Sequence, residues 1–241
     1  MKGKLITTGI DGIFVNSKTY SDAHKEWFNF YAKLLKMPEL RKYANLPQDQ
    51  YWPGVKKAMA ALYGREFEKD DELHTYTARH TYQQLVLQCA AKLHRQKTLV
   101  KAVHKECIDL FRFLKMRGHN FWLVTTSPEG IVSRLLELAG CSDLFSRIES
   151  CSITEKPSSE YVIGRMLGQL RERKSRLPAV HIGAGLGAVK AYNKQKIPVV
   201  LTMWEANSAN YKEIEQAELL APATAKDPEE LRSALEVLLK I

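Results

Sequence analysis

The sequence has few cysteines and no long apolar run. Its four cysteines stand far apart among 241 residues: Cys89, Cys107, Cys141 and Cys151. They lack the close Cys/His spacing of a zinc site, so we expect reduced, buried thiols. No stretch approaches the roughly 18 consecutive apolar residues of a membrane span. Because an apolar run also begins almost at once, at Leu5-Ile6, we expect a cytoplasmic protein with no signal peptide and no membrane partner.

Acidic residues are outnumbered. The chain carries 36 lysines and arginines against 27 aspartates and glutamates, a formal net charge of +9. This balance favours anionic partners, among them nucleic acids and phosphorylated small molecules. The densest basic stretches, Lys92–Lys105 and Arg165–Arg176, have helical periodicity, and we expect them to be solvated helix faces.

Short apolar runs typical of buried strands occur four times, at 4–8, 121–126, 179–182 and 198–203. From about residue 99 they alternate with predicted helices at 99–117, 128–140, 158–173, 185–195, 207–217 and 228–240. Gly118 and Gly140 are predicted to end helices, and Asp227-Pro228 to begin one. The alternation predicts an α/β fold whose core is a Rossmann-like, doubly wound parallel sheet with helices on both faces.

The segment 17–97 has no strand-like run but repeats apolar residues at helical spacing, as in Trp27, Phe28 and Tyr31. It is far too long for an ordinary connection between sheet elements. We therefore predict an inserted all-helical cap domain at 17–97, on a core formed by 1–16 and 98–241. Three prolines, Pro38, Pro47 and Pro53, are expected to break the cap into several helices.

Four segments resemble, in order and spacing, the four motifs of the haloacid dehalogenase (HAD) superfamily. They are Thr8–Ser17 (TGIDGIFVNS), Leu123–Glu129 (LVTTSPE), Lys156–Glu160 (KPSSE) and Ile182–Ala191 (IGAGLGAVKA). The first is similar to Asp-x-Asp-Gly-Thr-Leu-x-x-Ser and the last to Gly-Asp-Ser-x-x-Asp-x-x-Ala. The insert lies where phosphoglycolate phosphatase-like members carry a helical cap. Activity does not follow from the fold, so each position has to be compared separately.

The resemblance implies that the catalytic chemistry is impaired. In the family, the first carboxylate of the first motif attacks phosphorus to form a covalent aspartyl-phosphate. Here that position is Gly9, the lost nucleophile, while the acid/base carboxylate survives as a vestigial Asp11. Glycine at this point would also suit a strand end that needs free dihedral angles.

The metal-ligand positions are degenerate as well. The family holds Mg²⁺ with carboxylates at the positions of Gly9, Ala184 and Ala188, none of which has a side-chain oxygen here. We therefore expect no cofactor and no bound metal, and Mg²⁺ would be expected only if activity were retained.

The phosphate-binding half of the motifs is retained in Thr125, Thr126 and Lys156. Helix N-termini after the strands would add free backbone N–H groups. Two arrangements remain open: Lys156 forms a structural ion pair with Asp11, or the pocket holds phosphate or a phosphorylated ligand. Two other residues are expected to pack rather than react, His181 inside a strand and Trp204 near the mouth of the site.

The leading hypothesis is a pseudophosphatase with a ligand-binding, regulatory or scaffolding role, which could involve a protein partner. The first alternative is an active phosphoglycolate phosphatase-like hydrolase of phosphomonoesters that uses Asp11 or a cap carboxylate. The candidate cap carboxylates are Asp22, Asp49 and Asp70. The second alternative is a basic protein that binds nucleic acid or a ribonucleoprotein through Lys92–Lys105 or Arg165–Arg176.

Overall fold

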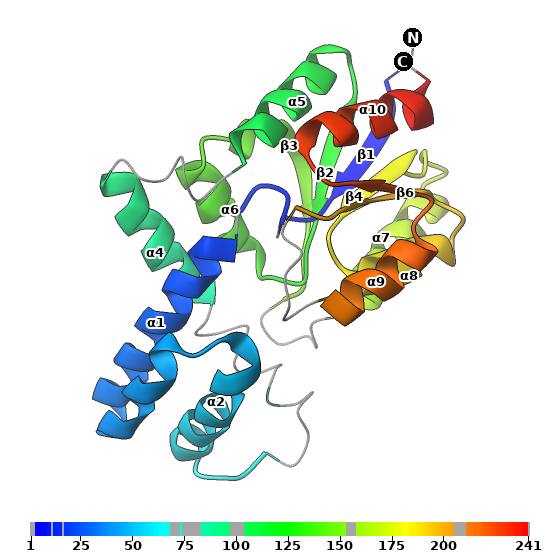
Figure 1. Cartoon of the computed structure of the whole chain (residues 1–241). Helices are drawn as coiled ribbons and strands as arrows, with labels where there is room; N and C mark the ends of the chain where they lie inside the picture. Colours follow the sequence, from blue (N-terminus) through cyan, green and yellow to red (C-terminus); the bar gives the residue numbers. More distant parts are fainter. Residues whose placement is uncertain are drawn as a thin grey trace.

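A computed structural model describes residues 3–10, 12–15, 17–67, 73, 83–96, 104–152, 158–204 and 211–240. Six parallel strands form one sheet in the order β3-β2-β1-β4-β5-β6. Their bounds are β1 Leu5–Thr8, β2 Asn120–Val124, β3 Phe145–Glu149, β4 Val180–Gly183, β5 Val199–Thr202 and β6 Ala223–Ala225. Helices cover both faces of the sheet (Figure 1). The predicted α/β fold with a doubly wound parallel sheet is thereby confirmed.

The strands that were predicted from the sequence are more deeply buried than the two that were not. Every residue of β4 and β5 is buried, as expected for central strands of a parallel sheet covered on both faces. The edge strands β3 and β6 were not predicted. β3 reads Phe-Ser-Arg-Ile-Glu and only its last residue is buried, while β6 is three residues long. Edge strands are commonly short and polar, so they lack the apolar run on which the prediction depended.

In the described part of the chain, six α-helices cover the core: α5 Lys105–Met116, α6 Glu129–Leu138, α7 Ser159–Glu172, α8 Leu186–Asn193, α9 Tyr211–Leu220 and α10 Pro228–Leu239. The buried side chains of α5, α6 and α10 join one apolar cluster, and those of α7, α8 and α9 join a second cluster on the other face. Gly118 and Gly140 have φ of 87° and 65°, which confirms them as helix stops in the left-handed region. Among the residues that the structure describes, no helix is both long and apolar enough to cross a membrane.

The cap lies between β1 and α5, and the elements described in it are all helices. Its elements are α1 Ser17–Leu34, the 3-10 helix η1 Pro38–Asn45, α2 Gln48–Tyr63 and α4 Gln83–Arg95 (Figure 1). Its interior is aromatic: the Trp27 ring lies 4.8 Å from Phe28 and 4.5 Å from Tyr31. A helical cap is thus present, while its limits at 17 and 97 stay a prediction.

The three cap prolines behave differently. Pro38 begins η1 and Pro47 is the N-cap of α2, so both interrupt the chain as expected. Pro53 was predicted to break a helix, and this is wrong because it lies inside α2, which continues to Tyr63. Proline near a helix start removes one donor, and burial of neighbouring residues such as Tyr51 and Val55 keeps the helix together.

The two chain segments that join cap and core lie side by side. The backbone N–H of His104, just before α5, donates to the carbonyl of Phe14 at 3.0 Å. The Phe14 ring is fully buried and makes edge contacts with Phe111 and Phe145 at 5.0 and 5.4 Å. This junction fixes the loop after β1 at the carboxyl edge of the sheet, where ligands of open α/β folds bind.

None of the four cysteines forms a disulfide, and all four are buried, as expected. Burial raises the pKa of the thiols of Cys107 and Cys141 to about 12. Both are therefore protonated packing residues at neutral pH, since the thiolate is the reactive form.

Candidate functional site

Strand register brings three of the four motifs together. Thr8 of β1 is opposite Leu123 of β2 on one side and Ile182 of β4 on the other. Gly9, Thr125 and Ala184 follow these positions by one or two residues, so the loops that carry them leave the same edge of three adjacent strands. The candidate site is this edge. Asp11 and Lys156 lie outside the described residues, as does Asp70.

Gly9 is held at the end of β1. Its N–H donates to the carbonyl of Ile182 at 3.0 Å, and its own carbonyl accepts from the Thr8 hydroxyl at 3.0 Å. Its φ does not lie in the left-handed region, unlike that of Gly12, which is 66°. Of the residues that the structure describes, a Cβ at position 9 would meet the Cδ1 atom of Ile13 alone, at an ordinary 3.7 Å. The idea that this position needs the freedom of glycine is therefore wrong, because an L-residue fits its backbone and its surroundings.

Glycine is required at the end of the neighbouring strand β4, at Gly183. A Cβ there would come within 2.8 Å of Nε2 of His181, which is closer than real Cβ atoms approach. The ring of His181 cannot yield easily, since it stacks on Tyr192 at 4.1 Å and its Nδ1 lies 3.1 Å from the Thr7 hydroxyl. The glycine of the fourth motif thus has a packing reason that the glycine of the first motif lacks.

The loop after β2 positions hydrogen-bond donors at the same edge. The N–H of Thr125 donates to the carbonyl of Glu149 at 2.9 Å, and its side chain is buried, with 8% exposed. The Thr125 hydroxyl accepts from the N–H of Ser127 at 3.1 Å. A hydroxyl has one donor and two acceptor sites, so its hydrogen stays available to a ligand. Thr126 follows on the same turn and is half-buried.

The helices that start at this edge differ in their caps. The N-cap residues of α6 and α8 are Pro128 and Gly185, and neither gives a side-chain hydrogen bond to the first turn. In α7 and α10, Ser158 and Asp227 close the first turn with their own side chains. Uncapped first turns leave backbone N–H groups and the positive end of the helix dipole open to an anion.

Ala184 and Ala188 are half-buried, Ala184 just after β4 and Ala188 on α8. With Gly9, they offer only hydrogen and methyl groups. These three positions do not fit a magnesium ion, because Mg²⁺ requires oxygen ligands in octahedral geometry. Among the residues that the structure describes, no group of three or more His, Cys, Asp or Glu side chains could hold a metal ion.

His181 is a packing residue, as expected. It is almost fully buried in β4, and desolvation lowers its pKa to about 3, so the ring is neutral at physiological pH. Trp204 is half-buried after β5, packs against the core and has its ring 5.9 Å from that of His104 at the cap junction. Of the rival cap carboxylates, Asp22 lies in α1 and Asp49 at the start of α2.

Sequence reasoning missed two polar residues at strand ends. Thr202 ends β5 and is buried, with its hydroxyl 3.4 Å from the carbonyls of Gly12 and Gly183. It therefore bridges the loops of the first and fourth motifs. The sequence does contain a sign of this role, because Thr202 is the single polar residue at the end of the apolar run Val-Val-Leu.

The second missed residue is Glu149, which is buried at the end of β3. It forms ion pairs with Arg147 and, at 4.0 Å, with Arg165 of α7. Part of the basic stretch Arg165–Arg176 is therefore not a solvated face, because Arg165 turns inward to this carboxylate and to the carbonyl of Ser150. Glu149 could not be recognised as a strand-end residue from the sequence, because β3 itself was not predicted.

No protein-family model matches the sequence, and no curated protein matches it either. Solved structures do resemble it. A predicted phosphoglycolate phosphatase from Haemophilus somnus has a TM-score of 0.61 at 16% identity, with 97% of this chain and 98% of that chain covered. A predicted phosphatase from Clostridium acetobutylicum has a TM-score of 0.60 at 16% identity, with both chains covered completely.

A hydrolase of the HAD-like family from Streptococcus pneumoniae has a TM-score of 0.55 at 15% identity, with 97% of this chain and 98% of that chain covered. The likeness therefore includes the helical insert as well as the sheet. The fold of the chain is that of HAD-like hydrolases and phosphatases, and at these identities the likeness concerns the fold alone.

Proposed function

We propose that the chain is a catalytically impaired HAD-like phosphatase homologue, a pseudophosphatase that binds phosphate or a phosphorylated small molecule without hydrolysing it. The observation that carries the proposal is Gly9. Its backbone conformation and its open surroundings would accept a side chain, yet it supplies no carboxylate. The described neighbours of position 9 therefore leave room for the carboxylate that the sequence lacks.

Hydrolysis by the family route requires a carboxylate that attacks phosphorus, and no side chain at position 9 can do so. Asp11 follows two residues later, and a nucleophile misplaced by about 1 Å can lose ~100-fold in rate. Ala184 and Ala188 remove two further oxygen ligands from the position where the family holds Mg²⁺. Three losses at one site make turnover by this route negligible.

Binding has better support than catalysis. The Thr125 hydroxyl has a hydrogen to donate, and the first turns of α6 and α8 have no side-chain cap. Each helix N-terminus carries about half a positive charge, which favours an anion. Lys156 adds a full positive charge from the third motif. Where the family balances such charge with several carboxylates, only Asp11 remains, so an anion gains more by binding here.

The activity test uses phosphoglycolate and p-nitrophenyl phosphate with and without Mg²⁺. We expect no Mg²⁺-dependent turnover, because most of a barrier reduction of more than ~10 kcal/mol is missing. Turnover above about 1 s⁻¹ that Asp11→Asn abolishes would establish the active-hydrolase alternative. If Asp22→Asn, Asp49→Asn or Asp70→Asn abolishes it instead, a cap carboxylate carries the reaction.

The binding test is a thermal-shift series in phosphate, sulfate and chloride at matched ionic strength. Phosphate should raise the melting temperature of the parent, since at a hundred times the Kd it adds about 2.7 kcal/mol of stability. Lys156→Met and Thr125→Val should lose the shift, while Thr125→Ser and the exposed control Lys226→Met keep it. If phosphate stabilises the parent no more than chloride does, the structural Asp11–Lys156 pair becomes the better description.

A further inference from the structure

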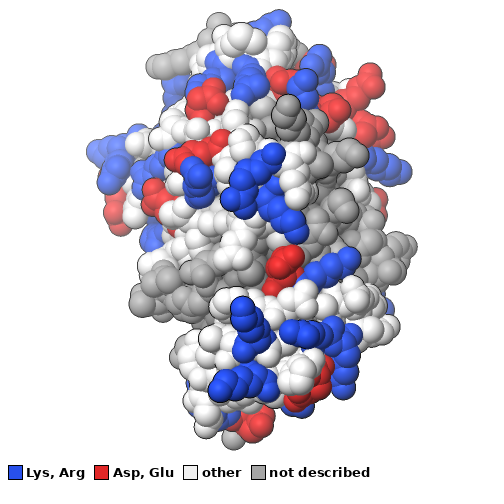
Figure 2. Space-filling view, turned by 90° about the vertical axis from the view of Figure 1, so that its left-hand side faces the viewer, with Lys and Arg blue, Asp and Glu red and all other residues white. Residues whose placement is uncertain are grey.

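The cap carries a basic surface unrelated to the strand ends. Between residues 30 and 67 the sequence has seven lysines and arginines and three acids, a formal net charge of +4 out of +9 for the whole chain. Figure 2 faces the side of the molecule where α1 and η1 lie, and Lys and Arg outnumber Asp and Glu on its lower part, which is the cap. This part of the cap is therefore basic.

Two large apolar side chains stand in the middle of this charge. Phe30 and Leu34 are 48% and 54% exposed, and Lys33 is exposed between them on the same stripe of α1. The inward stripe of α1, with Trp27 and Phe28, already fills the core of the cap. Phe30 and Leu34 thus lie on the outward side of α1, where the Phe30 ring meets Tyr31 edge to face at 5.2 Å and stays about half exposed.

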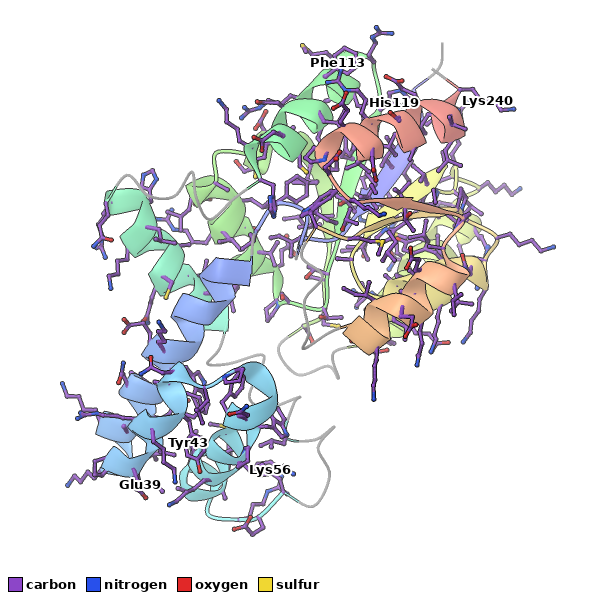
Figure 3. The ribbon with its side chains drawn as sticks, in the orientation of Figure 1. Glu39, Tyr43, Lys56, Phe113, His119 and Lys240 are labelled. Atoms are coloured by element: carbon purple, nitrogen blue, oxygen red, sulfur yellow. The ribbon has the colours of Figure 1, made fainter. Side chains whose placement is uncertain are left out.

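The 3-10 helix η1, which packs against α1, adds further cations. The Tyr43 ring of η1 lies 5.7 Å from Phe28, so η1 runs back along α1 (Figure 3 labels Tyr43 and Glu39). Leu40 and Ala44 of η1 are buried, which turns Arg41 and Lys42 outward. We call the resulting set the α1–η1 surface; its members are Phe30, Lys33, Leu34, Lys36, Arg41 and Lys42.

The acids near this surface are already neutralised by other helices. Glu39 pairs with Lys57 of α2 at 2.8 Å, and Glu26 pairs with Lys92 of α4 at 3.8 Å. Over the described part of the chain, the four cations of the α1–η1 surface have no ion pair of their own. Lys42 lies 5.0 Å from the centre of the Tyr43 ring, an additional contact that fixes its direction without neutralising it.

Three kinds of anionic partner differ in what they require. Cores of protein interfaces are depleted in lysine. Stable membrane association needs a broad apolar face or two anchoring signals, whereas α1 presents only Phe30 and Leu34 outward. Single-stranded nucleic acid needs cations along its backbone and an exposed ring on which a base can stack, and the α1–η1 surface has both.

We propose that the α1–η1 surface binds single-stranded nucleic acid, with phosphates against Lys33, Lys36, Arg41 and Lys42 and a base stacked on Phe30. This inference is independent of the phosphate site, which lies at the carboxyl edge of the sheet. It assigns nucleic-acid binding to the α1–η1 surface rather than to Lys92–Lys105 or Arg165–Arg176. Sequence preference is expected to be weak, because stacking accepts every base.

The test is fluorescence anisotropy of labelled oligo(U) and oligo(dT) 20-mers with the full chain between 50 and 200 mM salt. Four phosphate contacts predict a slope of log K against log salt of about −3. The variant with Lys33, Lys36, Arg41 and Lys42 all changed to Gln should lose binding and slope together. A matched quadruple on the core, with Lys105, Lys174, Lys212 and Lys226 changed to Gln, should keep both.

Phe30→Ala should weaken binding by about 5- to 150-fold, the range for loss of one stacked base, and Phe30→Trp should retain it. Phe30 and the four cationic positions are exposed, so unchanged melting temperatures would confirm that the variants fold. The proposal is overturned if the parent fails to bind at 50 mM salt, if the core quadruple loses as much as the cap quadruple, or if duplex DNA binds as tightly as single strands. Binding to vesicles of phosphatidylcholine and phosphatidylserine without binding to oligonucleotides would identify a membrane surface instead and also overturn it.

Discussion

The loops after β1 and β4 and the loop after β2 share one edge of the sheet but differ in what their side chains offer. Gly9, Ala184 and Ala188 present hydrogen and methyl groups, whereas Thr125 presents a hydroxyl whose position is fixed by the N–H of Ser127. The missing carboxylate at position 9 is not matched by a change in the backbone, since the described residues around Gly9 would accommodate a side chain. A fold can therefore keep the geometry of a site after losing its reactive groups, because strand register and loop anchoring do not depend on the carboxylates.

The most direct test of this difference is to restore carboxylates at the three positions that lack them. In the triple variant Gly9→Asp, Ala184→Asp, Ala188→Asp, we expect Mg²⁺-dependent phosphomonoester hydrolysis at least ~100-fold above the parent, because a nucleophile and metal ligands are restored together. The matched control replaces the same residues with Asn, which has nearly the same volume but no charge. Equal rates in the Asp and Asn variants would show that the remaining groups are no longer positioned for catalysis.

Two glycines at neighbouring strand ends sharpen the comparison further. Gly183→Ala should lower the free energy of unfolding by about 1–3 kcal/mol, because its Cβ would press on the His181 ring. Gly9→Ala should cause no loss and could add up to about 1 kcal/mol by restricting the unfolded chain. Urea denaturation at pH 7 measures both. A larger loss at Gly9 than at Gly183 would mean that glycine is structural at the first motif after all.

The buried ring beside Gly183 predicts a pH dependence. The pKa of His181 falls from 6.5 to about 3 on folding because of burial. Between these values the unfolded chain binds one more proton than the folded chain, so the stability present above pH 6.5 is lost as the pH falls, at about 1.4 kcal/mol per pH unit. At pH 5 the loss from this residue is about 2 kcal/mol. Urea denaturation at a series of pH values from 7.5 to 4.5 gives the free energy of unfolding as a function of pH. This free energy should fall less steeply with decreasing pH for His181→Phe than for the parent, while the exposed variant His94→Gln should follow the parent.

The smallest effect concerns how helices begin. Asp227 accepts from the N–H groups of Glu229 and Glu230 at 2.9 and 2.8 Å, so Asp227→Ala should cost about 1 kcal/mol. Gly185→Ala at the uncapped start of α8 removes no such bond and should change stability by less than about 0.5 kcal/mol. A cost at Gly185 as large as that at Asp227 would indicate that the open first turn of α8 is already satisfied within the protein.

Four central strands, the core helices and the helical insert could be recognised from the sequence because burial on a parallel sheet leaves continuous apolar runs. The edge strands could not, since three of the five residues of β3 are polar and β6 has only three residues. Pro53 shows the opposite failure, in which a strong local signal is overruled by packing of α2 into the cap. Glu149 and Thr202 were missed for a related reason: a single polar residue at a strand end reveals its role only when its neighbours in space are known.

The sequence by itself determined that positions 9, 184 and 188 have no carboxylates, because the absence of an atom does not depend on folding. It also determined the alternation of strands and helices, which follows from the spacing of apolar residues. Only the tertiary structure decided which glycine is structurally required, Gly183 rather than Gly9, because the answer depends on how near the His181 ring lies. The same is true of the pKa of His181 and of the α1–η1 surface: burial and the pairing of charges are relations between residues distant in the chain, and they exist only once the chain is folded.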